Sequence, residues 1–203
     1  MLLGFYNYTV ILTYISLLVS TLGVFLAMTG QIKLAVVCLM VSGLCDMFDG
    51  KIASTRERTK EEKRFGIQID SLCDLICFGV LPAIIVYQIR EGRIDSIFVG
   101  SFYVLCALIR LSYFNVMEET RQDEVGGIRE AYQGLPVTTI AIILPFFYIF
   151  SNGLRSIVFS LVLFAVGSLF LSTINVKKFG VKGMAMLAFL GMAELILILY
   201  SGF

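Results

Sequence analysis

The chain has 203 residues, of which 58% are hydrophobic and only 15% are charged, and its formal net charge is +1. Its mean hydropathy of +0.90 lies far from that of soluble domains, in which about a quarter of the residues are charged. We therefore expect an integral membrane protein with no nucleic-acid partner. The chain contains no histidine, which excludes imidazole bases, most zinc sites and haem ligation.

Apolar segments follow one another along the whole chain, and about 20 apolar residues are enough to span a bilayer. About seven helices are predicted, at Tyr8–Thr29, Ile32–Ala53, Phe65–Gln88, Ile94–Val116, Leu135–Phe150, Leu154–Thr173 and Val181–Tyr200. The first segment is too long for the core of a cleavable signal peptide, so we expect it to remain as a helix. Pro82, Pro136 and Pro145 predict helix starts or kinks.

The predicted fold is an all-α integral membrane protein, a polytopic bundle of six core transmembrane helices plus about one extra C-terminal helix. We expect one domain over residues 1–203. Basic residues gather in the linker 54–64, after Val116 and before Val181. The positive-inside rule then places the N-terminus and these loops in the cytoplasm, as in a multi-pass protein of the cell membrane. The basic linker has two interpretations, a topology signal that also attracts anionic lipid, or a substrate-binding element.

Four carboxylates inside apolar segments, Asp46, Asp49, Asp70 and Asp74, predict a functional site. An ionised Asp at the centre of a spanning helix costs about 2.5 to 3.5 kcal/mol, so the four need water, cations or metal around them. Spacings of three and four residues put each pair on one helix face. Two such faces would form a carboxylate pocket suited to Mg²⁺ or Mn²⁺, and pairs of such cations are a recurrent device for phosphoryl displacement.

Small residues accompany the acids. Gly50 and Gly66 remove one side chain from each helix face, which either admits a bulky ligand or permits close helix packing. Cys73 and Cys77 share a face with two of the acids, but sulfur prefers softer metals, and we interpret them as packing residues. All five cysteines lie inside apolar segments, so no disulfide framework is expected.

Two stretches carry a recognisable signature, Asp46-Met-Phe-Asp49-Gly50-Lys-Ile-Ala53 and Gly66-Ile-Gln-Ile-Asp70-Ser-Leu-Cys-Asp74. They resemble the pattern D-x-x-D-G-x-x-A-R, spacer, G-x-x-x-D-x-x-x-D of the CDP-alcohol phosphotransferase family, with seven of eight marked positions matching. The departures are Ser54, where the family has Arg, and a longer spacer. Arg56, Arg58 or Lys51 is expected to replace the missing Arg.

Three further stretches resemble the serine-using branch of the family, and the likeness runs from about Asn7 to Phe179. They are Asp70-Ser-Leu-Cys-Asp74 continuing to Phe78-Gly79-Val80-Leu81-Pro82-Ala83, then Arg110-Leu-Ser-Tyr113-Phe114-Asn115, and Gln133-Gly134-Leu135-Pro136. The resemblance implies transfer of a phosphatidyl-type group from CDP-diacylglycerol or its ether analogue CDP-archaeol to L-serine, with release of CMP. A homodimer among membrane lipids is also expected.

The resemblance also implies roles for individual residues. Asp46, Asp49, Asp70 and Asp74 would bind two divalent cations, Mg²⁺ or Mn²⁺, and Asp74 would in addition act as the general base. The nucleotide-lipid would be bound by Asn7, Gly50, Ala53, Arg56 and Gly66, with Gly50 and Ala53 making room for the cytidine.

Serine carries a carboxylate, so its pocket needs a cation. Arg110 is the candidate, because an Arg inside an apolar segment rarely faces lipid and its planar fork suits a carboxylate. Tyr113, Asn115 and Gln133 complete the expected pocket, or make ordinary interhelical hydrogen bonds. Alternatives are transfer to glycerol 3-phosphate or inositol phosphate, which would need more cations near Arg110, and a divalent-cation transporter, for which no repeat symmetry is found.

Overall fold

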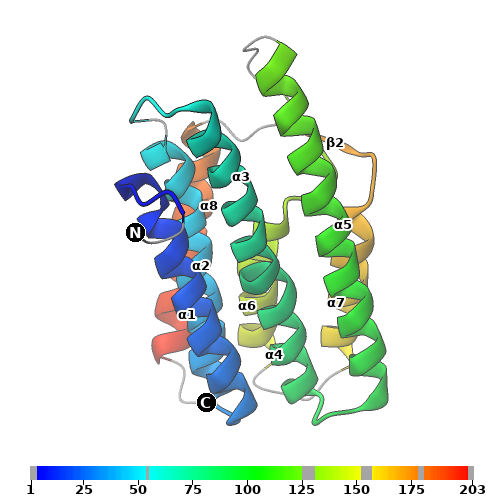
Figure 1. The fold of residues 1–203 in the computed structure, drawn as a ribbon. Helices are drawn as coiled ribbons and strands as arrows, with labels where there is room; N and C mark the ends of the chain where they lie inside the picture. Colours follow the sequence, from blue (N-terminus) through cyan, green and yellow to red (C-terminus); the bar gives the residue numbers. More distant parts are fainter. Residues whose placement is uncertain (1–3, 54, 125–130, 152–156, 178–180, 201–203) are drawn as a thin grey trace.

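Long apolar runs separated by short polar connections produce a bundle of helices that run roughly side by side (Figure 1). The computed structural model describes residues 4–53, 55–124, 131–151, 157–177 and 181–200. Its helices are α1 (Ile11–Met28, after a 3₁₀ turn at Tyr8–Val10), α2 (Ile32–Ala53), α3 (Lys60–Asp74), α4 (Leu81–Ile89), α5 (Ile94–Glu124), α6 (Ile140–Phe150), α7 (Val158–Phe170) and α8 (Val181–Tyr200). The all-α fold is confirmed.

In the part of the chain that the structure describes, three continuous helical segments are long and apolar enough to cross a bilayer: Tyr8–Met28, Lys60–Ile89 and Ile94–Thr120. Large apolar side chains such as Leu18, Phe98 and Phe189 are exposed on the outside of the bundle. In water this surface would be costly, whereas a bilayer solvates it. The chain is a membrane protein.

The second of these segments consists of α3, a π-helical turn at Leu75–Val80 and α4. The turn ends just before Pro82, which lies in the first turn of α4 as a predicted helix start. Because Pro82 has no N–H, it leaves the carbonyl of Phe78 without its helical donor. The fully buried Tyr103 hydroxyl of α5 donates to that oxygen at 2.7 Å. The irregular backbone is therefore satisfied from a neighbouring helix.

Several helix boundaries differ from the prediction: α6 begins at Ile140 and not at Leu135, and α7 ends at Phe170 and not at Thr173. Two further differences have a reason in local chemistry. α3 begins at Lys60 and not at Phe65, because Thr59 and Glu62 form a reciprocal capping box. α5 continues past Val116 to Glu124, since the polar residues after Val116 are good helix formers. Figure 1 shows this end of α5 extending beyond the rest of the bundle.

A short antiparallel ribbon, which was not predicted, joins the connections before α6 and after α7. Its strands are β1 (Ala131–Gln133) and β2 (Asn175–Lys177). Gly134 directly after β1 donates its N–H to the carbonyl of Ile174 at 2.8 Å. The ribbon therefore fixes the start of the α6 segment beside the end of α7.

α2 packs closely against α1 and α6 through small residues. A Cβ at Gly43 would lie 2.6 Å from the Cβ of Ala141 on α6. On the α1 side, the Ser20 hydroxyl donates to the Ser42 hydroxyl at 2.7 Å, and Ser42 donates to the carbonyl of Ser16 at 3.1 Å. Small residues and interhelical hydrogen bonds hold helices together in membranes. They fix the rotation of α2 and hence the direction of its acidic residues.

Candidate active site

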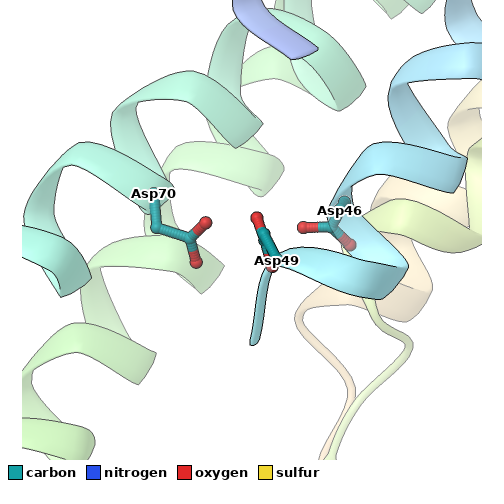
Figure 2. Close-up of side chains that lie close together, drawn as sticks. All are labelled: Asp46, Asp49 and Asp70. Atoms are coloured by element: carbon teal, nitrogen blue, oxygen red, sulfur yellow. The ribbon is translucent and has the colours of Figure 1, made fainter. Parts of the chain in front are cut away.

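Three carboxylates converge where the end of α2 meets α3 (Figure 2). Asp46 and Asp49 come from the last two turns of α2, and Asp70 comes from α3. One oxygen of each lies within 4.8 Å of an oxygen of the other two. Such a group of hard, half-buried anions can hold a metal ion, as the spacing of the acids predicted. We call it the carboxylate cluster.

Asp74 lies beside the carboxylate cluster and is not one of its three members. Its side chain interacts with that of Asp46. On the opposite side, the hydroxyl of Thr13 on α1 donates to Oδ2 of Asp49 at 3.4 Å. Sequence reasoning did not find Thr13, although its place one turn before Ser16 on the α2-facing side of α1 is a usable signal.

A cavity of about 200 Å³ lies on the linker side of the cluster and is called the linker cavity. Asp49 and Asp70 line it together with two basic side chains of the linker region, Arg58 and Lys63. A Cβ at Gly50 would meet no atom within 4 Å, so the expected open space is present there. A Cβ at Gly66 would lie 3.0 Å from Nη1 of Arg58, which shows that this glycine lets the guanidinium approach α3.

Asn7 and Arg56, two predicted nucleotide contacts, both lie against Glu62 at the start of α3. Nδ2 of Asn7 donates to Oε1 of Glu62 at 3.3 Å, and Arg56 makes an ion pair with the same oxygen at 3.5 Å. The Asn7 carboxamide also caps the 3₁₀ turn by accepting from Thr9. Neither residue lines the linker cavity, where Arg58 stands instead. The side chain of Ala53 and the whole of Ser54 lie outside the described residues.

A second cavity, of about 320 Å³, lies on the α5 side of the cluster and is called the α5 cavity. Two residues of the expected serine pocket, Arg110 and Asn115 of α5, line it together with Ser71 and Asp74 of α3. Ser71 donates to Oδ1 of Asn115 at 2.6 Å, which ties α3 to α5 at this cavity. Tyr113 is not among the lining residues and is 48% exposed. The side chain of Gln133 lies outside the described residues.

Arg110 is buried, and its guanidinium is held by groups of three different segments. Nη1 donates to the carbonyl of Phe170 at 3.4 Å, and the guanidinium carbon lies 4.6 Å from the centre of the Phe114 ring. Gly134 lies beside the guanidinium as well, since a Cβ built there would be 2.8 Å from Nη1. Gly134 also has a φ of +72°, so both its conformation and its surroundings require glycine. Its role beside Arg110 was not predicted.

Comparison with known proteins agrees with this geometry. A family model described as CDP-alcohol phosphatidyltransferase matches residues 6–173, which includes the carboxylate cluster and both cavities. The chain therefore belongs to the CDP-alcohol phosphatidyltransferase family of membrane proteins.

Three individual relatives show which members of the family this chain resembles. The chain is 38% identical over 115 residues to the CDP-diacylglycerol–serine O-phosphatidyltransferase of Saccharomyces cerevisiae, covering 55% of this chain and 41% of the relative. It is 32% identical over 160 residues to the archaetidylserine synthase of Methanothermobacter thermautotrophicus, covering 77% and 64%. A Helicobacter pylori CDP-diacylglycerol–serine O-phosphatidyltransferase is 29% identical over 141 residues, covering 68% and 55%. In each case the match spans less than two thirds of the relative.

Proposed function

We propose that this protein is a phosphatidyltransferase of lipid synthesis that uses serine as its acceptor. It transfers the lipid phosphate group of CDP-diacylglycerol, or of the ether lipid CDP-archaeol, to the hydroxyl of L-serine and releases CMP. The names of the yeast and archaeal relatives support serine as the acceptor. We propose that residues 1–203 act as one catalytic domain, because the family match runs through most of the bundle and α8 packs on α2 and α6.

One observation carries the proposal: the carboxylate cluster stands between two polar cavities. Asp49 and Asp70 line the linker cavity, whereas Asp46 and Asp70 line the α5 cavity. Two substrates bound in these cavities would meet at the cluster. A direct displacement between a nucleotide-lipid and an alcohol needs this arrangement, since both reactants must be held in contact at one phosphorus.

The linker cavity suits the CDP part of the lipid substrate. Arg58 and Lys63 supply positive charge for the pyrophosphate, and the open space at Gly50 admits the nucleotide. Asn7 and Arg56 would then act indirectly, by holding Glu62 and the linker in place.

Tail recognition would use a third cavity, of about 210 Å³, between α2, α6 and α8. Its lining is largely apolar, and Asp46 lies among the lining residues. A hydrocarbon chain there would lead from the membrane to the cluster. Both ester and ether tails fit such apolar surfaces, because the recognition is by shape.

The α5 cavity suits the acceptor. Arg110 would bind the serine carboxylate, and Asn115 would complete the pocket. Asp74 lines the same cavity, beside the three-member cluster, and would take the proton of the serine hydroxyl. The hydroxyl oxygen then forms a bond to the lipid-bearing phosphorus, the bond from that phosphorus to the bridging oxygen breaks, and CMP leaves with the electron pair.

Divalent cations fit the donor set, which consists of three hard carboxylates. We propose that Asp46, Asp49 and Asp70, with Asp74 as a further ligand, hold two Mg²⁺ or Mn²⁺ ions. When bound, these ions would neutralise the pyrophosphate charge and stabilise the charge that develops on the leaving CMP.

We propose that the active site faces the cytoplasm of the cell membrane. The cluster lies at the same end of the bundle as the basic linker and the extended end of α5, opposite the α1–α2 turn (Figure 1). The positive-inside rule gives this end a cytoplasmic location. A homodimer is part of the proposal, and the mass of the purified protein in detergent tests it.

The acceptor assay tests the function directly. Purified protein is given a CDP-lipid, Mg²⁺ or Mn²⁺, and in separate reactions L-serine, glycerol 3-phosphate, inositol or inositol phosphate, and CMP release is measured. We expect release with serine. Release only with a polyol phosphate would overturn the serine assignment, and metal uptake by vesicles without CMP release would favour a transporter.

A further inference from the structure

Four polar side chains of α3 and α5 form a hydrogen-bonded chain that starts at the α5 cavity. The Ser71 hydroxyl donates to Oδ1 of Asn115 at 2.6 Å. Nδ2 of Asn115 donates to Oε1 of Gln68 at 3.3 Å, and Nε2 of Gln68 donates to Oε1 of Glu119 at 3.0 Å. Ser71 and Asn115 line the α5 cavity, whereas Gln68 and Glu119 line neither that cavity nor the linker cavity. Gln68 and Glu119 have no role in the mechanism above.

Helix geometry places these residues in two facing rows. Gln68 and Ser71 are three positions apart on α3, and Asn115 and Glu119 are four positions apart on α5, so each pair shares a helix face. The chain crosses from one row to the other at each hydrogen bond. It therefore ties the helix of Asp70 to the helix that carries the acceptor pocket.

The chain has a fixed direction, which is set at its outer end. The carboxylate of Glu119 accepts hydrogen bonds and donates none, so Gln68 must turn its amide nitrogen toward it. The oxygen of Gln68 then faces Asn115 and requires the nitrogen of that amide. This leaves Oδ1 of Asn115 facing Ser71, which must donate its hydroxyl proton.

The consequence at the α5 cavity is an oxygen that can only accept. The proton of Ser71 is committed to Asn115, so only lone pairs of its oxygen remain for a ligand. Ser71 and Asp74 are three positions apart on one face of α3, and both line the cavity. The oxygen of Ser71 therefore belongs to the same wall of the cavity as the proposed general base.

An amino acid acceptor carries an ammonium close to its reacting hydroxyl. An ammonium has three donors and no acceptor, which matches an oxygen that can only accept. A phosphate dianion offers no donor to such an oxygen. The direction of the chain therefore favours an amino acid over a polyol phosphate.

We propose that Glu119 is a positioning residue for the acceptor: acting through Gln68 and Asn115, it makes Ser71 the group that binds the ammonium of an amino acid. Arg110 binds the carboxylate of the same acceptor in the mechanism proposed above. This inference rests on the proposed function and extends it, because it names the group that recognises the ammonium.

Reversing the chain tests this role. Glu119→Lys puts a donor at the outer end, which should turn over both amides until Asn115 donates to Ser71 and the Ser71 proton points out of the chain. The double variant Gln68→Glu/Glu119→Lys should restore the parental direction, because the carboxylate introduced at position 68 accepts from both the lysine and Asn115. Glu61→Lys is the matched control, since it makes the same change of charge in the first turn of α3 and Glu61 lines neither cavity.

The assay compares L-serine with 3-hydroxypropionate, which lacks the ammonium. CMP release gives kcat and KM, and an analogue that does not react is measured as a competitor of serine. Glu119→Lys should raise the KM for serine about ten- to a hundredfold, as expected for a lost hydrogen bond to a charged group. It should leave 3-hydroxypropionate and the KM for CDP-lipid unchanged. The double variant should return the KM for serine to near the parental value, and Glu61→Lys should behave as the parent.

Ser71→Ala tests the inference independently of the lysine variants and of their folding. It removes the accepting oxygen itself and should cause the same selective loss of serine relative to 3-hydroxypropionate.

Three outcomes would overturn the inference while the parent still releases CMP with serine. The first is a parental KM for serine in Glu119→Lys or in Ser71→Ala. The second is a double variant as weak as Glu119→Lys, which would assign the effect to the charge of the lysine. The third is an equal loss of serine and 3-hydroxypropionate, which would mean that the chain only holds α3 against α5. A parent that releases no CMP with serine would overturn both proposals together.

Discussion

Replacing Gly134 by alanine tests the arrangement around Arg110 most directly. A Cβ at this position would lie 2.8 Å from Nη1 of Arg110, 2.8 Å from the carbonyl oxygen of Phe170 and 2.9 Å from that of Ser172. The two backbone oxygens cannot move cheaply, so the guanidinium must move. The left-handed conformation at φ +72° costs a further 1 to 2 kcal/mol or so for a residue with a Cβ.

Two effects of Gly134→Ala are expected. Strain and overpacking together should lower the free energy of unfolding by about 2 to 4 kcal/mol. Displacement of Arg110 should remove the proposed charge-assisted hydrogen bond to the serine carboxylate, worth about 1.5 to 3 kcal/mol, and so raise the KM for serine about ten- to a hundredfold. The KM for CDP-lipid should change little, because Gly134 lines neither cavity.

Gly30 is the matched control, because it separates conformational strain from contact. It has a φ of +82° in the α1–α2 turn, and a Cβ there would meet no atom within 4 Å. Gly30→Ala therefore has the same kind of backbone strain without a clash. Thermal unfolding in detergent and steady-state kinetics are measured for both variants. If Gly134→Ala lost no more stability than Gly30→Ala and kept the parental KM for serine, the reasoning would be refuted.

Three other variants test the cluster, the base and the frame. Asp49→Asn should weaken Mn²⁺ binding about tenfold or more, which corresponds to about 1.4 kcal/mol, and electron paramagnetic resonance measures this binding. Full turnover of the parent protein in excess chelator would contradict the metal assignment. Asp74→Asn should keep CDP-lipid binding by calorimetry but lose about 10² to 10⁴ in kcat, and recovery at high Mn²⁺ would make Asp74 only a ligand. Tyr103→Phe should lower the unfolding free energy by about 1 to 3 kcal/mol, because the buried carbonyl of Phe78 loses its donor; an unchanged melting temperature would contradict this.

Hydropathy predicted the helical bundle because spanning a bilayer imposes one length and one composition on each segment. It could not predict the start of α3, which depends on the capping box of Thr59 and Glu62, or the end of α5, which continues as a polar helix. It also gave no sign of the ribbon between β1 and β2, since pairing of three-residue strands depends on distant chain segments.

The convergence of three of the four acids was predicted, because local spacing decides that part of the geometry. Asp46, Asp49 and Asp70 converge because a helix brings residues three apart to one face and because α2 and α3 both pack against α1. Contacts across the bundle, such as that of Gly134 with Arg110, have no signal in spacing. Glu194 in α8 was also passed over, although it is buried with no hydrogen-bond partner among the described residues.

The carboxylates at the two ends of the bundle have different partners, and this difference bears on catalysis. Away from the site, Asp95 forms ion pairs with Arg90 at 3.1 Å and Arg93 at 3.3 Å. It also accepts a hydrogen bond from the Ser160 hydroxyl at 3.0 Å, so cations and a donor of the protein itself balance its negative charge. At the site end, three acids face one another and the cations Arg58 and Lys63 lie across the linker cavity.

Like charges at close range repel one another. In the proposed mechanism divalent cations would neutralise the acids, and the pyrophosphate would neutralise Arg58 and Lys63. Because each ligand lowers the cost of binding the next, divalent cations and CDP-lipid should bind with positive coupling. The close contacts of α2, at Gly43 and between Ser20 and Ser42, hold this helix in the orientation that brings its acids into the cluster.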